Sequence, residues 1–282
     1  MIIDYIGTGG AEGVPALFCT CSVCRKARET RGRNIRLRSS VCINKEILID
    51  LSPDIHSAAI AGRIEPFRLQ HLLLTHAHED HCALHQLMYR AQPAFCTPEE
   101  DFTLEVYGNA ECLKKYTLAC RENGGSINHT HFNLIKPFDT VSMGDITAVA
   151  LPADHAPGQD AVMYLLEQDG VRFLYAEDTG SFPAPTEEYL KGKYCRAISL
   201  DCSFCMGKPD GDSGHLGYRA MLRQLDRLKA MGAADHATRV IAQHFSHNGL
   251  RASGGPLTDS ELCAMMQPDN ISPAYDGMSV KV

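Results

Sequence analysis

Four side chains that commonly bind metal ions lie within six consecutive positions of the sequence. The segment LLLTHAHEDHC (72–82) runs from an apolar stretch into His76, His78, Asp80 and His81. Because residues two apart in an extended chain point the same way, His76 and His78 can bind one ion. Asp80 and His81 follow where the chain turns, so they can face a second ion about 3.5 to 4 Å from the first. One such histidine alone would usually be a surface or hydrogen-bonded residue.

A second group of potential metal ligands consists of cysteines. The segment FCTCSVC places Cys19, Cys21 and Cys24 in a C-x-C-x-x-C pattern. Three thiolates this close are typical of a structural zinc site, which needs one further ligand from elsewhere in the chain. The alternatives are three buried thiols or a redox-active pair. A reducing compartment and the tight spacing favour zinc over both.

The elements that must position these residues can be predicted from apolar periodicity and turn residues. Strands are expected at the runs IIDYIG, SSVCIN, EILIDL, HLLLTH, LEVYG, ITAVALP, VMYLLE, VRFLYAE, AISLD and RVIAQH. Helices are expected over Pro53–Gly62, His81–Ala91, Ala110–Asn123, Pro185–Lys191, Gly214–Met231 and Thr258–Met266. Hairpin turns are expected at Asp169 and Gly170 and at Asn44 and Lys45. This mixture favours helices outside two packed sheets, although composition alone does not select that arrangement over other α/β folds.

The composition of the whole chain limits its partners. With 282 residues, 44% of them hydrophobic, the chain can bury a sizeable core, and residues 1–282 are expected to form a single domain. A formal charge of −7 is unfavourable for binding nucleic acid or an anionic membrane, so a small substrate is expected, while a homodimer is compatible. No secretory signal and no run long enough to span a membrane are found, which favours the cytoplasm. Without an export signal, the twelve cysteines do not suggest a disulfide framework.

The motif THAHEDH matches the HxHxDH signature of the metallo-β-lactamase superfamily, and it follows an apolar strand in the first third of the chain, as it does there. The resemblance implies an α/β fold, the αββα four-layer sandwich, with a two-metal site. It assigns His155 in PADHAPG to the first metal, Asp178 in YAEDTGS to both metals, and His244 in RVIAQHFSHNG to the second. Asp50 in ILIDLSP resembles the aspartate that orients a ligating histidine, although a turn-capping role fits it almost as well.

The same resemblance implies the chemistry. Two divalent cations, Mn²⁺ or Zn²⁺ or alternatively iron, lower the pKa of water to about 7, and the hydroxide they hold is the expected nucleophile. They also neutralise charge on a phosphoryl oxygen and on the leaving alkoxide. A carboxylate such as Asp80 on the second metal is a feature of members that cleave phosphodiesters, so Asp80 is an expected catalytic residue. Activity as a β-lactamase or a thioesterase fits less well.

A closer resemblance begins at GTGGAEGVPALFCTCSVC (7–24), which is similar to the opening of the phosphoribosyl cyclic phosphate phosphodiesterases of the carbon-phosphorus lyase pathway. The segments SLDCS (199–203), SGHLGY and YDGM are similar as well. An H-x-x-H pair in that subfamily implies that HFSH supplies His244 to the catalytic site and His247 as the fourth zinc ligand, beside a cysteine loop at about residues 15–30. His215 resembles a histidine that acts as general acid or phosphate contact near the leaving group. A surface histidine at a helix start is the alternative.

Three segments depart from that subfamily, at residues 96–131, 202–214 and 250–256. They could line the pocket, so they leave the identity of the substrate open. GTGG is expected to form a tight turn, because the lysine and hydroxyl residue of a P-loop are missing. The other candidates are expected to be buried or loop thiols, and surface or supporting histidines: Cys202, Cys205, His85, His129 and His131.

The sequence therefore predicts a metal-dependent phosphodiesterase that hydrolyses a small phosphodiester, in particular a cyclic ribose phosphate. One alternative is an RNA-processing nuclease of the same fold, against which stand the acidic charge and the lack of a long basic arm. The other is a non-hydrolytic protein resembling the member of the pyrroloquinoline quinone pathway that shares the cysteine cluster. Such a protein would be an oxygenase or a binding module, and iron in the site would favour it.

Overall fold

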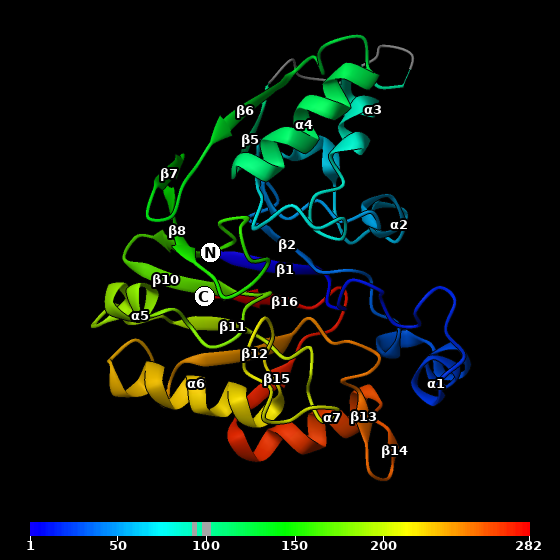
Figure 1. Ribbon diagram of the computed structural model, residues 1–282, viewed down its shortest axis with the longest axis vertical. Coiled ribbons are helices and arrows are strands. Elements are labelled where there is room, and N and C mark those ends of the chain that lie inside the picture. Colours follow the sequence, from blue (N-terminus) through cyan, green and yellow to red (C-terminus); the bar gives the residue numbers. More distant parts are fainter. Residues whose placement is uncertain (92–94, 98–102) are drawn as a thin grey trace.

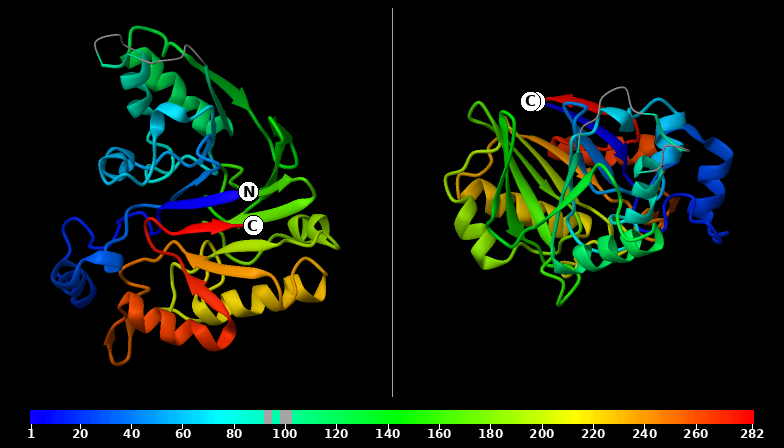
Figure 2. Two further views of the ribbon diagram at one scale, coloured as in Figure 1. Left: turned by 180° about the vertical axis from the view of Figure 1, so that it is seen from behind. Right: turned by 90° about the horizontal axis from the view of Figure 1, so that it is seen from above.

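Two sheets packed face to face, with helices on both outer faces, form the computed structural model of the chain (Figures 1 and 2). The structure describes residues 1–91, 95–97 and 103–282. This arrangement confirms the predicted four-layer α/β fold. The two termini lie side by side, since the Met1 amine donates to the carbonyl of Val282 over 3.1 Å. No helix in the described part of the chain is long and apolar enough to cross a membrane.

The first sheet contains seven strands from the N-terminal half and one end of the chain. In spatial order these are β16 (Ser279–Lys281), β1 (Ile2–Gly7), β2 (Ser40–Ile43), β3 (Ile47–Ile49), β4 (His71–Leu73), β5 (Leu104–Gly108) and β6 (Thr130–Leu134). Strands β16 to β3 are antiparallel, and β3 to β6 run parallel. Asn44 and Lys45 join β2 to β3 with φ of 50° and 66°, so the predicted hairpin turn is confirmed.

The second sheet repeats this mixture of antiparallel and parallel pairs. Its order is β15 (Ile271–Pro273), β12 (Arg239–Gln243), β11 (Ala197–Asp201), β10 (Val171–Ala176), β9 (Val162–Gln168), β8 (Ile146–Pro152) and β7 (Thr140–Met143). Strands β7 to β10 are antiparallel, and β10, β11, β12 and β15 run parallel. Asp169 and Gly170, both with positive φ, form the predicted turn between β9 and β10. A separate small hairpin pairs β13 (Arg251–Ala252) with β14 (Gly255–Pro256).

Helices cover the outer faces of the two sheets (Figure 1). Their bounds are α1 (Ser22–Thr30), α2 (Ile55–Ile60), α3 (Met88–Ala91), α4 (Ala110–Glu122), α5 (Ala184–Leu190), α6 (Tyr218–Ala230) and α7 (Asp259–Met266). Helix α6 buries Met221, Leu225 and Leu228, which recur every three or four residues along one face. These side chains pack in one apolar cluster with Ile198 and Leu200 of β11, so they attach the helix to the second sheet.

The inner faces of the two sheets share an apolar core. Its largest members, Tyr5, Tyr164, Phe173 and Tyr175, are fully buried. Burying each such side chain stabilises the fold by about 1.5–3 kcal/mol. A buried hydroxyl needs a partner, and that of Tyr164 donates to the carbonyl of Leu74 over 2.7 Å. This contact joins the second sheet to the end of β4, where the predicted metal ligands begin.

The helix predicted over residues 81–91 is wrong in its first part. Residues 81–83 continue pairing with Leu51, whose N–H donates to the carbonyl of His81 over 2.8 Å. The N–H of Ala83 donates back to the carbonyl of Leu51 over 3.0 Å. Bonds to a neighbouring strand end replace the bonds that a helix would need, so only a 3₁₀ turn at Leu84–Leu87 and the short α3 remain.

Two further boundaries differ from the sequence-based expectation. The helix predicted from Gly214 begins at Tyr218, because the carbonyl of Leu216 accepts the N–H of Phe204 and so serves a neighbouring loop. The cysteine segment expected to be a loop over about residues 15–30 contains helix α1 from Ser22 onward. Cys24 therefore lies on a helix, and only the first two cysteines lie on the loop.

Candidate active site

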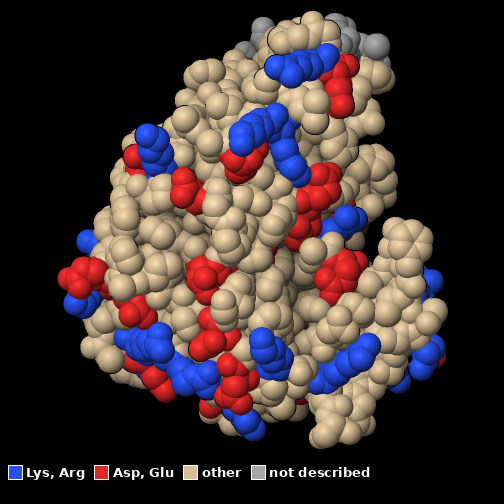
Figure 3. All heavy atoms as spheres, viewed as in Figure 1, with Lys and Arg blue, Asp and Glu red and all other residues tan. Residues whose placement is uncertain are grey.

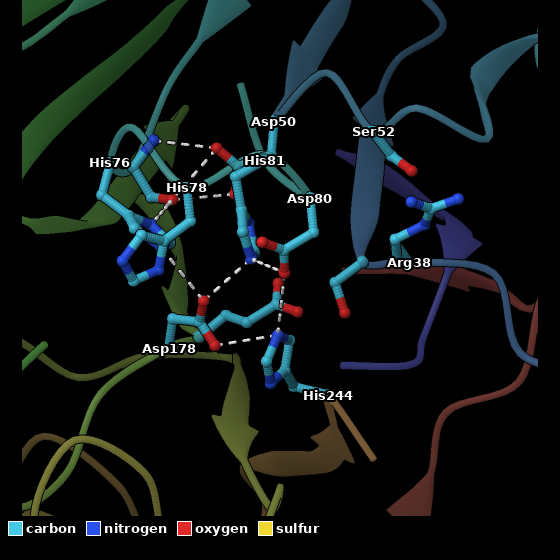
Figure 4. Close-up of polar contacts among 12 residues, drawn as sticks. Arg38, Asp50, Ser52, His76, His78, Asp80, His81, Asp178 and His244 are labelled. Carbon is cyan, nitrogen blue, oxygen red and sulfur yellow. Dashed lines mark hydrogen bonds and ion pairs between the residues drawn. The ribbon is translucent and has the colours of Figure 1, made fainter. Parts of the chain in front are cut away.

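The predicted catalytic residues lie at the carboxyl ends of strands from both sheets. The residues and the strands that they follow are Asp50 (β3), His76, His78, Asp80 and His81 (β4), His155 (β8), Asp178 (β10) and His244 (β12). Strands β3 and β4 run parallel, as do β10, β11 and β12, so their carboxyl ends meet at one edge. Figure 4 shows the side chains converging there from both halves of the chain.

The first potential ligand set contains three histidines and Asp178. Nε2 of His155 lies 3.1 Å from Nδ1 of His78 and 3.7 Å from Oδ2 of Asp178. Nε2 of His76 lies 3.4 Å from the same carboxylate oxygen. Four atoms bound tetrahedrally at about 2.1 Å from one ion lie about 3.4 Å apart. The set therefore has the spacing of a single metal site.

The second potential ligand set contains Asp80, His81, Asp178 and His244, all of them buried. Nε2 of His81 lies 2.8 Å from Oδ2 of Asp80 and 2.8 Å from Oδ2 of Asp178. Nε2 of His244 lies 2.8 Å from Oδ1 of Asp178. Asp178 thus offers its oxygens to both sets, which is the position that a bridging carboxylate would take.

Several buried polar atoms of this cluster lack a hydrogen-bond partner among the described residues. They are Nε2 of His76, His81 and His244, and Oδ1 of Asp178. Buried polar atoms are normally paired, because leaving one unpaired costs about 1–3 kcal/mol. Four of the seven such atoms in the described part of the chain belong to the two ligand sets; the other three lie on His71, Glu177 and Gln243. The residues therefore fit two divalent cations, which would satisfy these atoms together.

The opposite ring nitrogens of these histidines are held by the surrounding protein. Nδ1 of His81 lies 2.7 Å from Oδ2 of Asp50. Nδ1 of His155 donates to a backbone carbonyl over 2.8 Å, and Nδ1 of His244 lies 2.5 Å from the hydroxyl of Ser203. Such partners fix the orientation and the tautomer of an imidazole and leave Nε2 free to bind metal.

Asp50 contacts a predicted ligand and also stands at a strained strand end. The fully buried carboxylate accepts the N–H of Thr75 over 2.8 Å and lies 2.7 Å from Nδ1 of His81. Its φ is 65°, and Asp178 and His244 have φ of 46° and 60°. Residues other than glycine rarely adopt this left-handed backbone conformation, and backbone strain of this kind is found most often at functional sites. Of the two roles expected for Asp50, the orientation of a histidine is the one that these contacts support.

Metal ions and protons compete for the ligands of this cluster. Burial alone would favour the neutral acid, but His244 and His81 hold the pKa of Asp178 well below its usual range. His81 likewise outweighs burial at Asp80 and lowers the pKa of that carboxyl. Burial and the neighbouring imidazoles hold the pKa of His76 well below its usual value. These carboxylates are thus in the ionised form that binds metal, and His76 is neutral as well. At His81 and His244 burial disfavours the charged ring, but the neighbouring carboxylates outweigh it and raise the pKa of both imidazoles well above the usual value, so these two rings must release a proton when a metal ion binds.

His215 lies beside the second ligand set rather than on the open surface. Its Nδ1 lies 2.9 Å from Oδ2 of Asp201, the fully buried last residue of β11, and 3.5 Å from Oδ1 of Asp178. Burial disfavours the charged imidazole, but the Asp201 carboxylate outweighs it and raises the pKa of His215. Asp201 also accepts the N–H groups of Ser203 and Leu216, each over 2.9 Å. The carboxylate is therefore fixed, and it holds the His215 ring in place.

A cavity of about 460 Å³ opens onto the two ligand sets. Besides metal-site residues, its lining contains Gly10 and Glu12 from the N-terminal turn and Phe204 and Lys208 from the loop after β11. The turn expected at GTGG (7–10) is displaced: Gly7 ends β1 and Gly9 pairs with Arg38 and Phe245, while the turn itself spans Gly10–Gly13 and is closed by the Gly13 N–H, which donates to the carbonyl of Gly10 over 2.9 Å. Of the three divergent segments, only 202–214 contributes lining among the described residues, and part of 96–131 lies outside them.

The cysteine cluster meets His247 as the resemblance implied. Nδ1 of His247 lies 3.4, 3.4 and 3.5 Å from the sulfurs of Cys19, Cys21 and Cys24. Tetrahedral zinc with sulfur at about 2.3 Å and nitrogen at about 2.0–2.1 Å places these atoms about 3.6 Å apart. Burial opposes ionisation of Cys21, but hydrogen bonds from the Cys24 backbone and His247 lower the pKa of its thiol to about 5. The four side chains are therefore arranged as a closed Cys₃His zinc site would require.

The remaining sequence candidates lie away from the cluster. His85, His129 and His131 are exposed, and Cys202 and Cys205 are fully buried, which agrees with the expectation for each. The sequence-based interpretation gave no role to several residues that the structure places at the site: Thr75, Asp201, Ser203, Glu12, Phe204 and Lys208. Asp201 and Ser203 lie in the motif SLDCS at a strand end, which was the available signal.

Comparison with solved structures finds the same fold over the whole chain. A diphosphatase of the PhnP family is 20% identical, with a TM-score of 0.72 over 99% of this chain and 96% of that one. Zinc-bound PqqB from Methylobacterium extorquens is 17% identical, with a TM-score of 0.74 over 100% of both chains. At these identities the similarity shows the fold alone.

Comparison of sequences adds a local match and a family. The Porphyromonas gingivalis (strain ATCC BAA-308 / W83) octanoyltransferase is 42% identical over 80 residues, which span 27% of this chain but only 15% of that protein. A family model described as the beta-lactamase superfamily domain matches residues 45–245, most of the chain. With the HxHxDH motif, the fold and the buried His/Asp cluster in place, the chain belongs to the metallo-β-lactamase superfamily and has the metal-site architecture of its metal-dependent hydrolases.

Proposed function

We propose that the protein is a phosphodiesterase that hydrolyses a small phosphodiester, in particular a cyclic ribose phosphate. The observation that carries the proposal is the second ligand set, in which Asp80 lies 2.8 Å from Nε2 of His81. A carboxylate there completes a second, oxygen-rich metal position beside the first, and two adjacent cations suit the charged oxygens of a phosphate. His215 adds a candidate proton donor within the same cavity.

Residues of this chain would position the reaction. Two divalent cations, Mn²⁺ or Zn²⁺ or alternatively iron, would lower the pKa of water to about 7 and neutralise charge on phosphoryl oxygens. Asp50 and Ser203 hold the rings of His81 and His244, so the ligands need no reorganisation when substrate binds. His215, held at Nδ1 by a carboxylate, can donate the Nε2 proton to the departing oxygen.

The cavity supports a small substrate rather than a polymer. A volume of about 460 Å³ lies within the range of small-molecule sites. Among the described lining residues, Lys208 is the one lysine or arginine. On the face drawn in Figure 3, Lys and Arg side chains are interspersed with Asp and Glu, without a broad area of positive charge alone. A long phosphate backbone would gain little attraction here, which argues against the nuclease alternative.

A panel of cyclic and linear phosphodiesters, assayed with added Mn²⁺, tests the proposal. We expect strict preference for cyclic ribose phosphates, with precursor transfer RNA left uncut. Preference for RNA ends would overturn the proposal in favour of a processing nuclease. Metal analysis of protein purified without added metal completes the test, because iron together with absent hydrolysis would favour an oxygenase.

We also propose that Cys19, Cys21, Cys24 and His247 hold one structural zinc ion. Four protein ligands leave no open position for water, so this ion would stabilise the fold without activating a nucleophile. The site joins the N-terminal loop to the residue three positions after His244. Zinc there would fix the segment that carries the last catalytic ligand.

A further inference from the structure

The loop that follows β11 is the divergent segment that reaches the cavity, and two of its side chains differ in character from the rest of the lining. Phe204 is half-buried and Lys208 is exposed, and both line the cavity. The surrounding lining consists of metal-site residues, small residues and polar groups. An aromatic ring beside a cluster of histidines and carboxylates has no part in metal binding. Its place in the lining therefore calls for an apolar, flat part of the substrate.

The backbone holds this loop in one conformation. The N–H of Phe204 donates to the carbonyl of Leu216, and the N–H of Lys208 donates to the carbonyl of Phe204, each over 3.0 Å. The second bond closes a five-residue turn, and Nζ of Lys208 lies over the Phe204 ring, so the two side chains lie on the same side of the loop. A Cβ added at Gly211 would lie 2.6 Å from Cδ2 of Phe204, so the absence of a side chain there makes room for the ring.

The Phe204 ring is also oriented by its neighbours. Nζ of Lys208 lies 5.0 Å from the ring centroid, a cation–π distance. The ring centroids of His215 and Phe204 lie 5.4 Å apart, and the two ring planes form an angle of 73°. The aromatic ring therefore stands directly beside the histidine proposed to act on the leaving oxygen. A group attached to the reacting ribose would reach it.

We propose that Phe204 and Lys208 form a stacking subsite for a planar heteroaromatic ring, so that the preferred substrates are nucleoside cyclic phosphates rather than base-free sugar phosphates. This inference rests on the proposed phosphodiesterase activity and specifies its substrate class. Stacking of a base on an aromatic side chain is tolerant of base identity, and a nearby ammonium adds attraction to the π-system. Loss of one such stack costs about tenfold or more in binding.

A matched pair of substrates tests the subsite through activity. Adenosine 2′,3′-cyclic phosphate and methyl riboside 2′,3′-cyclic phosphate differ only in the base. We expect kcat/KM of the wild-type protein to be about tenfold higher for the adenosine substrate than for the methyl riboside, mainly because its KM is lower. In Phe204→Leu the ratio of the two kcat/KM values should fall toward one. Tyr189→Leu is the matched control, because the Tyr189 ring also has a lysine over it, Nζ of Lys193 at 4.7 Å, but lies outside the cavity lining. An unchanged ratio in Phe204→Leu would overturn the subsite while leaving the phosphodiesterase proposal intact.

A binding measurement separates the subsite from catalysis. The chain contains no tryptophan, so Phe204→Trp introduces a single tryptophan at the stacking position, whose fluorescence can be excited separately from that of the tyrosines. We expect adenosine 3′-phosphate to quench this fluorescence and ribose 5-phosphate to leave it unchanged. Phe138→Trp places the tryptophan on a side chain that is 43% exposed and outside the cavity lining, and it should not respond. Equal quenching of both variants, or of neither, refutes the subsite even if no phosphodiester is hydrolysed.

Discussion

Asp50 shows how one residue outside the ligand sets can control a metal site. It holds Nδ1 of His81 at 2.7 Å and is itself fixed by the backbone and hydroxyl of Thr75. Partners of this kind typically contribute 10–100-fold to metal affinity. We therefore expect Asp50→Asn to weaken Mn²⁺ binding by about that factor, measured by reconstitution of activity in metal titrations. Asp145→Asn, at an exposed turn, should bind as the parent does; equal affinities in the two variants would show that Asp50 only caps the strand end.

Asp80 and His81 would bind only one of the two proposed metal ions. Both belong to the second ligand set and neither to the first. We expect Asp80→Ala or His81→Ala to abolish cleavage of bis(para-nitrophenyl) phosphate and to remove one metal ion per chain, with the fold retained. Elemental analysis and circular dichroism provide the measurements. Near-wild-type rates in either variant would contradict the two-metal proposal.

His215 can be tested through the leaving group. A general acid matters most when the departing oxygen is basic, and little when it is p-nitrophenolate. We therefore expect His215→Ala to slow hydrolysis of a cyclic ribose phosphate by about 10²–10⁴-fold and that of bis(para-nitrophenyl) phosphate much less. Asp201→Asn should show the same pattern more weakly, because Asp201 positions the His215 ring but does not line the cavity. Equal losses on both substrates would assign His215 to phosphate binding instead.

The residues of the site were predictable to different degrees, for physical reasons. His76, His78, Asp80 and His81 are adjacent in sequence, so local geometry already brings them together. His155, Asp178 and His244 are brought in by tertiary structure, and only the resemblance to a family indicated them. Thr75 could not be assigned, because a hydroxyl at a strand end is ordinary until its partner is known.

At the scale of elements, strands were easier to predict than helix starts. Apolar runs such as HLLLTH are long enough to indicate a buried strand by themselves. The expected start at His81 failed because Leu51 pairs with the segment, and the start at Gly214 failed because the 204–211 loop takes the backbone bonds. Both wrongly predicted helix starts lie in segments whose backbone pairs with a neighbouring strand end or loop at the site instead of forming helical bonds.

The loop that carries Phe204 also depends on close packing against the segment after His244. A Cβ at Gly249 would lie 1.9 Å from the carbonyl oxygen of Ser203, a backbone atom that cannot move alone. We expect Gly249→Ala to displace the loop, lower the melting temperature and reduce kcat/KM on every substrate. Gly254→Ala, where no atom lies within 4 Å, is the control. If both variants melt and react alike, the loop is not held by this contact.

Substitutions in the cysteine cluster should lower the stability of the protein without removing metal from the catalytic site. Cys21→Ser or His247→Ala removes one of four ligands, so the variant should lose one zinc ion and melt at a lower temperature while keeping metal at the catalytic pair. Metal content and calorimetry measure the two effects. A Cys21→Ser variant with full zinc content and an unchanged melting temperature, but without activity, would show that the cluster is not structural.

At the scale of the whole molecule, the metal site joins the two halves of the sandwich. The ligands after β4 come from the first sheet, and His155, Asp178 and His244 come from the second. Each proposed ion is held by residues of both sheets, since Asp178 belongs to both sets. Ions bound there would therefore stabilise the native arrangement against separation of the sheets, in addition to the chemical role proposed for them.

This link predicts how the protein responds to a chelator. A ligand that binds only the native state at a thousand times its Kd adds about 4 kcal/mol, which for a chain of this size raises the melting temperature by on the order of 10 °C. Chelation should therefore lower the melting temperature of the wild type, through both the catalytic pair and the zinc site. His247→Ala lacks the zinc contribution, so its melting temperature should start lower, fall less, and recover when Mn²⁺ is restored. If chelator leaves the melting temperature of His247→Ala unchanged while abolishing activity, the catalytic ions do not join the sheets, and the sandwich is stable on its apolar core alone.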